Sequence, residues 1–118
     1  MSRDLLLLLE HGFTDPAHPE QRYVCPDGIP VEGLLAGDPE RARRLDIKRL
    51  PFPRPRAEVA ALLGEAHQGL PVLILGDEQA TPADSDTNIQ TANGKRFVTD
   101  TRRILALLAE RHGFPHVH

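Results

Sequence analysis

The stretch Tyr23-Val24-Cys25-Pro26-Asp27-Gly28-Ile29-Pro30-Val31 contains the only cysteine of the chain and leads directly into a helix-like pattern. Apolar residues then recur at helical spacing, and Pro30 suits a first turn because its missing N–H would have no partner there. A second stretch, Leu70-Pro71-Val72-Leu73-Ile74-Leu75, opens with a proline and continues as an apolar run of strand length. A thiol before a helix and a proline at the start of a strand are the two features of the sequence that any prediction of the fold must explain.

Strand-like and helix-like patterns alternate on either side of these stretches. Strands are predicted over residues 5–9, 46–52, 70–75 and 95–98, and helices over 29–37, 39–45, 57–67 and 101–112. The polar segment 14–22 is predicted to be a surface loop, and Asn93-Gly94 the turn of an enlarged hairpin over 76–94. We therefore predict an α/β fold of order βαβαββα, with a four-stranded mixed sheet flanked by helices, in a single domain over residues 1–118.

Composition limits the class of protein. A chain of 118 residues with 40% hydrophobic residues is long enough for one core, and a net charge of -3 argues against a nucleic-acid partner. One cysteine cannot form an internal disulfide, which favours a reducing compartment. The apolar run at 5–9 is too short to cross a membrane. We expect a soluble, cytoplasmic protein without nucleic-acid or membrane partners.

The order of elements, with Cys25-Pro26 before the first helix and Leu70-Pro71-Val72 opening the third strand, resembles the thioredoxin-like superfamily. Within it, the pattern is similar to glutaredoxins and to the amino-terminal domains of glutathione transferases. The strings 23–35, 52–56, 62–65 and 68–73 look like an uncharacterised bacterial family of small thioredoxin-like proteins, which has no established activity. The resemblance implies a cis Leu70–Pro71 bond beside Cys25, where a substrate peptide could pair as an extra strand. The alternative is a trans proline on an edge strand.

The chemistry open to Cys25 is that of a single thiol. The amides at a helix N-terminus favour the reactive thiolate, whereas Asp27 opposes it if its carboxylate turns toward the sulfur. Gly28 occupies the position of the resolving cysteine in a Cys-x-x-Cys pair, so any redox cycle needs a second thiol from solution. Glutathione is the expected co-substrate, and a thiol or disulfide the expected substrate. No bound cofactor is expected.

The resemblance to glutaredoxins also implies roles for residues around the thiol. Arg54 or Arg56 could hold a carboxylate of glutathione, and backbone groups of Val72 could pair with the tripeptide. Thr99 and Asp100, before the last helix, could bind the γ-glutamyl end, although Asp100 would cap that helix in any case. The remaining candidate substrate contacts are Tyr23, Pro26, Leu70 and Pro71. His11 and His67 flank elements near the site and could act as a base.

Two other classes of function stay open. The first is a non-catalytic binding or dimerisation module, in which Cys25 is a small, partly buried residue and the chain could form a homodimer. The second is a metal or iron-sulfur ligand, but monothiol glutaredoxins of that type carry glycine where this chain has Pro26. No metal site is expected: the motif from residue 84 lacks the glycine and glutamate of a calcium loop. We expect His112, His116 and His118 to be solvated.

Overall fold

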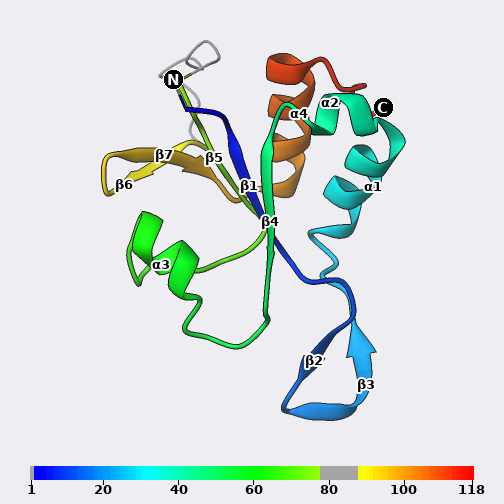
Figure 1. The fold of residues 1–118 in the computed structure, drawn as a ribbon, viewed down its shortest axis with the longest axis vertical. Coiled ribbons are helices and arrows are strands. Elements are labelled where there is room, and N and C mark those ends of the chain that lie inside the picture. The colour runs from blue at the N-terminus through cyan, green and yellow to red at the C-terminus, as the bar shows by residue number, and fades with distance from the viewer. Residues whose placement is uncertain (1, 78–87) are drawn as a thin grey trace.

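The computed structural model describes residues 2–77 and 88–118, which form an α/β protein (Figure 1). Its elements in chain order are β1 Leu5–Leu9, β2 Phe13–Asp15, β3 His18–Tyr23, α1 Ile29–Gly37, α2 Pro39–Ala42, β4 Asp46–Leu50, α3 Ala57–Leu63, β5 Val72–Ile74, β6 Gln90–Ala92, β7 Lys95–Val98 and α4 Thr101–His112. Within the described ranges, none of the helices combines the length and the apolar content needed to cross a lipid bilayer.

The main sheet is mixed and has the strand order β4-β1-β5-β7-β6. β1 pairs in parallel with β4 and antiparallel with β5, and β5 pairs antiparallel with β7. The predicted count of four strands was wrong, because β6 adds a fifth strand at the edge beside β7. The turn between these two strands is the predicted Asn93-Gly94, in which both residues have positive φ.

Alternating residues of the strands supply two separate hydrophobic clusters, one on each face of the sheet. Leu6 and Leu8 of β1 pack with residues of α1 and α4 on one face, and those two helices contact each other. On the other face Leu7 packs with Ile74 and with the α3 residues Val59 and Leu63. The first face is covered by helices of nine and 12 residues, whereas α3 has only seven.

The segment between β1 and α1 is not the loop that we predicted but a two-stranded hairpin, β2–β3. It projects from the rest of the molecule, away from both chain ends (Figure 1). Phe13 stacks on Phe52 with ring centroids 4.7 Å apart, and the Phe13 and Tyr23 rings lie 6.0 Å apart. A long-range aromatic contact thus attaches the hairpin at its base.

The predicted helices occur where expected, with some shorter than predicted. α4 begins and ends as predicted: the Asp100 carboxylate accepts a hydrogen bond from the Arg103 N–H, and Gly113 adopts the left-handed conformation after the last turn. α3 ends at Leu63 rather than at 67, because Gly64 follows with a φ of 92°. α2 is a single turn capped by Asp38.

A buried charged cluster ties the two ends of the described chain together. The Asp4 carboxylate, 1% exposed, accepts hydrogen bonds from two nitrogens of Arg111 at 2.7 Å and from the Gly76 N–H at 2.7 Å. His112 Nε2 lies 2.8 Å from the same carboxylate. The expectation that His112 is solvated was therefore wrong: it is 3% exposed, whereas His116 and His118 are exposed.

Candidate functional site

The predicted site residues gather at one end of the main sheet. The pairing makes the carboxyl ends of β1 and β7 and the amino end of β5 share that end. Cys25 follows the hairpin that leaves β1, and Pro71 directly precedes β5. The Thr101 hydroxyl donates a 3.0 Å hydrogen bond to the Asp27 carbonyl, which joins the start of α4 to the segment that carries the thiol.

Cys25 is half-buried and stands one turn before α1. Its carbonyl accepts hydrogen bonds from the N–H groups of Gly28, at 3.1 Å, and Ile29, at 3.0 Å. Gly28 has φ -86° and ψ -26°, a conformation open to any L-residue. An ideal Cβ placed on Gly28 would lie 3.5 Å from the Cys25 Cβ and 3.7 Å from its Sγ. The site therefore has room for a second side chain beside the sulfur.

Arg56 connects the segment before β5 to the segment after β4. It is 8% exposed, and its Nε and Nη2 donate hydrogen bonds to the Phe52 carbonyl while its Nη1 donates to the Gln68 carbonyl at 2.8 Å. Burial lowers the pKa of Arg56, the like charge of Arg54 lowers it further, and Cys25 acts in the opposite direction. Arg56 thus joins the two segments that precede β5 and follow β4 at this end of the sheet.

Of the two candidate arginines, Arg54 is exposed and Arg56 is held within the protein. Residue type does not reveal this difference, because the acceptors that hold Arg56 are backbone carbonyls, which every residue has. Two of the X-Pro bonds at this end are cis, namely Arg54–Pro55 and Leu70–Pro71. The second has the geometry that the resemblance implies, and the first was not anticipated.

A groove of about 310 Å³ runs beside Cys25 along α1. Its walls include apolar side chains of β1 and α1, and the polar residues that reach it are Glu10, His11 and Glu32. The Glu32 carboxylate is already paired with Arg49 at 2.7 and 2.9 Å. His11 and Cys25 therefore line the same groove, an arrangement that a role of His11 as a base would require.

A smaller cavity of about 150 Å³ lies between α3 and the strands β5 and β7. Val72, Thr99 and His67 line it together with Gln90, and the His67 ring packs edge-on against Phe97 at 5.1 Å. Val72 itself is buried and paired with Leu7 in the sheet. Gln90 was not among the predicted site residues, because it belongs to the edge strand that the sequence pattern did not reveal.

The other predicted contacts lie on several sides of the site. Pro26 is exposed, Tyr23 ends β3, and Leu70 is half-buried before β5. Asp100 is exposed and caps α4. Among the residues that the structure describes, no three His, Cys, Asp or Glu side chains are grouped as a metal site would need, and residues 84–87 of the calcium-like motif lie outside them.

The fold and the site define an α/β protein with one half-buried cysteine before a helix, at the end of a mixed sheet where a proline opens the neighbouring strand. The chain belongs to the family of proteins of unknown function DUF3088, whose family model matches residues 3–116. No curated protein and no solved structure matches it.

Proposed function

We propose that this chain is a thioredoxin-like protein that performs glutathione-linked monothiol chemistry at Cys25. The observation that carries the proposal is the geometry at Gly28, where a Cβ would lie 3.5 Å from that of Cys25. A disulfide needs its two Cβ atoms about 3.5–4.5 Å apart. This spacing supports the proposal that residues 25–28 correspond to a Cys-x-x-Cys site without its second thiol, and the parallel β1–β4 and antiparallel β1–β5 pairs support it as well.

The reaction would run in two exchanges. The Cys25 thiolate attacks the glutathione sulfur of a mixed disulfide, the substrate thiolate leaves, and a Cys25–glutathione disulfide forms. A second glutathione thiolate then attacks the glutathione sulfur of that disulfide, which releases glutathione disulfide and restores the Cys25 thiolate. A compartment rich in reduced glutathione, such as the cytoplasm, would supply this second thiol.

Three groups are suited to binding the tripeptide. Arg54 is the exposed cation that could pair with a glutathione carboxylate, since the guanidinium of Arg56 is already bonded to backbone carbonyls. Leu70 directly precedes Pro71 and lies outside β5, so its backbone groups could pair with the tripeptide. The small cavity lined by Thr99 and His67 could accept the γ-glutamyl end.

The test is reduction of a glutathionylated peptide by reduced glutathione, with and without the protein. We expect the protein to accelerate the reaction, Cys25→Ser to abolish the acceleration, and mass spectrometry to trap glutathione on Cys25. Arg54→Gln should raise the KM for glutathione about tenfold, the effect of losing one charge-assisted contact worth about 1.4 kcal/mol. Arg44→Gln is the matched control, because Arg44 is an exposed arginine before β4, at the other end of the sheet.

The alternative function is a non-catalytic binding module. It is favoured by the projecting hairpin β2–β3, an exposed surface of a kind that partners can bind. The rate of Cys25 alkylation against pH, with and without glutathione, separates the two. A thiol that reacts no faster than free cysteine and ignores glutathione would reject the enzymatic proposal.

A further inference from the structure

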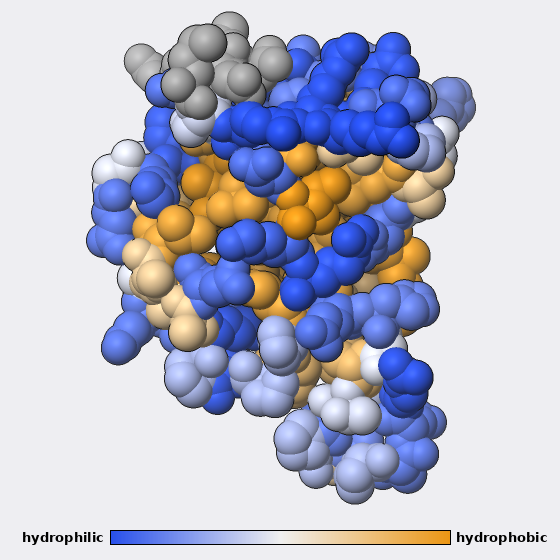
Figure 2. All heavy atoms as spheres, in the orientation of Figure 1, coloured by the Kyte–Doolittle hydropathy of each residue, from blue (hydrophilic) through white to orange (hydrophobic). Residues whose placement is uncertain are grey.

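The face of the sheet that carries α3 is only partly covered. A helix of seven residues is about 10 Å long, whereas the five residues of β1 span about 17 Å. α3 covers the end of this face near Cys25 and leaves the opposite end open. Hydrophobic side chains are visible there over β1 and β5, between α3 and the β6–β7 hairpin (Figure 2).

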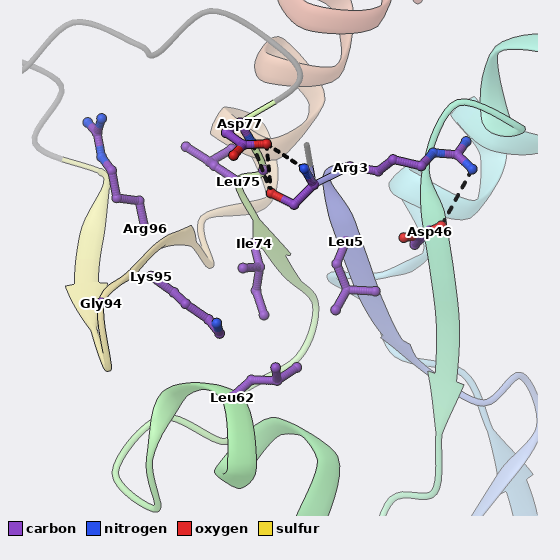
Figure 3. A pocket seen from close by; sticks show the side chains of 12 residues that line it. Arg3, Leu5, Asp46, Leu62, Ile74, Leu75, Asp77, Gly94, Lys95 and Arg96 are labelled. Carbon is purple, nitrogen blue, oxygen red and sulfur yellow. Dashed lines mark hydrogen bonds and ion pairs between the residues drawn. The ribbon is translucent and has the colours of Figure 1, made fainter.

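The uncovered end forms a groove of about 680 Å³. Leu5 of β1 and Ile74 of β5 are direct cross-strand partners, so their side chains stand next to each other on this face. Leu62 of α3 points into the groove from the opposite side (Figure 3). A groove of this size with an apolar floor is within the range of about 300–1,000 Å³ that ligand sites occupy.

Lys95 brings a positive charge to this apolar surface. Side chains alternate along β7, so Lys95 stands on the same face as Phe97, which belongs to the cluster beneath α3. Figure 3 shows the Lys95 side chain extending over the groove, whereas Arg96 points away from it. Lys95 is half-buried, and its ammonium group makes no hydrogen bond or ion pair with any residue in 2–77 or 88–118.

The carboxylates of the groove already have partners. Asp46 is paired with Arg3 at 3.6 Å. Asp77 accepts hydrogen bonds from the backbone N–H and the hydroxyl of Ser2, which lower its pKa. It lies at the end of the groove away from Leu62 (Figure 3). Of the described cations that line the groove, Lys95 is the one that extends over the apolar floor, and no described carboxylate is paired with it (Figure 3).

We propose that this groove binds an amphiphilic carboxylate, with its alkyl chain on Leu5, Ile74 and Leu62 and its carboxylate on Lys95. The argument is charge complementarity beside an apolar floor: a ligand with both features removes the exposed apolar area from water and pairs the lysine. The site is separate from the proposed redox function, because it lies at the opposite end of the sheet from Cys25.

The experiment compares decanoate with decanol, both below their aggregation concentrations, by methyl NMR of the full chain. We expect shifts at Leu5, Leu62 and Ile74, with decanoate binding about tenfold more tightly than decanol. Lys95→Met keeps the apolar stem and should reduce this ratio to about one without lowering the melting temperature. Lys48→Met is the matched control, because Lys48 lies on β4 and pairs with Glu58. The control should keep the tenfold preference.

Lysine acetylation gives an independent readout, since Lys48 and Lys95 are the only lysines of the chain. Decanoate should protect Lys95 several-fold and leave the modification of Lys48 unchanged. Equal affinity for decanoate and decanol, shifts outside the groove, or no binding would overturn the proposal. Protection of Lys95 that grows with protein concentration in the absence of ligand would also overturn it, because a second copy of the chain would then be the occupant.

Discussion

Gly28 is the residue whose Cβ position lies directly beside the Cys25 side chain. Neither its φ of -86° nor its surroundings require glycine, because an ideal Cβ would make only ordinary van der Waals contacts. Gly28→Cys should therefore form a disulfide with Cys25 when the protein is oxidised. The expected result is a loss of two hydrogens by mass spectrometry and no titratable thiol under denaturing conditions.

Gly33→Cys is the matched control for this change. Gly33 lies in α1, also beside the Cys25 groove, but a Cβ there would have nothing within 4 Å. This variant should keep both thiols free under the same oxidising conditions. If Gly28→Cys also kept two free thiols, the backbone geometry assigned to the segment from Cys25 to Gly28 would be incorrect.

Gly76 is a glycine for a different reason, namely close backbone approach. A Cβ there would lie 2.5 Å from the carbonyl carbon and oxygen of Arg3, and the Gly76 N–H donates to Asp4. Gly76→Ala should lower the free energy of unfolding by roughly 1–3 kcal/mol, the usual cost of overpacking. Gly33→Ala, in open space within a helix, should raise it by about 0.5–1 kcal/mol. Urea denaturation measures both, and effects of the same sign would contradict the packing at Gly76.

At the scale of elements, the hairpin β2–β3 packs on the body through the stack of Phe13 on Phe52. An isolated two-stranded hairpin is marginal in water, so the stack of Phe13 on Phe52 should keep it folded. Phe13→Leu should cost about 0.5–1.5 kcal/mol of pairing energy and expose the amides of β3 to hydrogen exchange. Protection in α4 should not change.

His18→Ala serves as the control for the hairpin. His18 is exposed at the start of β3 and leaves the aromatic stack intact. Its exchange pattern should match that of the wild-type protein. If Phe13→Leu left the β3 amides as protected as before, the hairpin would be held by something other than the stack.

The hairpin also shows where sequence patterns stop being informative. β3 has no apolar alternation, since five of its six residues are exposed, and prolines at 16 and 19 favour a loop. Its strand depends on pairing with β2 and on Phe52, which lies far away in sequence. By contrast, α4 was predicted to the residue because its cap at Asp100, its apolar stripe and its stop at Gly113 are all local signals.

The candidate site also has a part that the sequence predicts and a part that it does not. Cys25 before α1 and Pro71 before β5 follow from local patterns together with the predicted order of strands. The fixed position of Arg56 could not be predicted, because its partners are the carbonyls of Phe52 and Gln68. Every residue has a backbone carbonyl, so the sequence does not show which carbonyls accept hydrogen bonds from Arg56. Only the folded chain distinguishes Arg56 from the exposed Arg54.

At the scale of the whole molecule, the Asp4 cluster links the start of β1, the end of β5 and the last turn of α4. Burial alone would raise the pKa of the Asp4 carboxyl, but hydrogen bonds from His112, Arg111 and Gly76 hold it well below its usual range. A depressed carboxyl pKa stabilises the fold above the unfolded value of about 3.9, and that contribution is lost as the pH falls further. The protein should therefore lose stability progressively below about pH 4.

Asp4→Asn tests the origin of this pH dependence. It removes the charge that pairs the buried Arg111 and should cost about 3–5 kcal/mol at neutral pH, with a smaller difference from wild type at pH 3. Asp46→Asn, at an exposed ion pair with Arg3, should cost less than about 1 kcal/mol. Denaturant titrations across pH measure the loss of unfolding free energy in both variants. A carbon-13 NMR titration of the Asp4 carboxyl in the wild-type protein measures its lowered pKa directly. A difference for Asp4→Asn that did not shrink in acid would contradict this account.

The partners of Asp4 have a consequence for the order in which the chain can fold during synthesis. Arg111 and His112 come 107 and 108 positions after Asp4, so the whole segment between them must be synthesised before that carboxylate is paired. Until then, burial of the amino end of β1 would leave the Asp4 carboxylate without a counter-ion. The start of β1 must therefore wait for α4, which makes burial of this corner of the sheet a late event in folding.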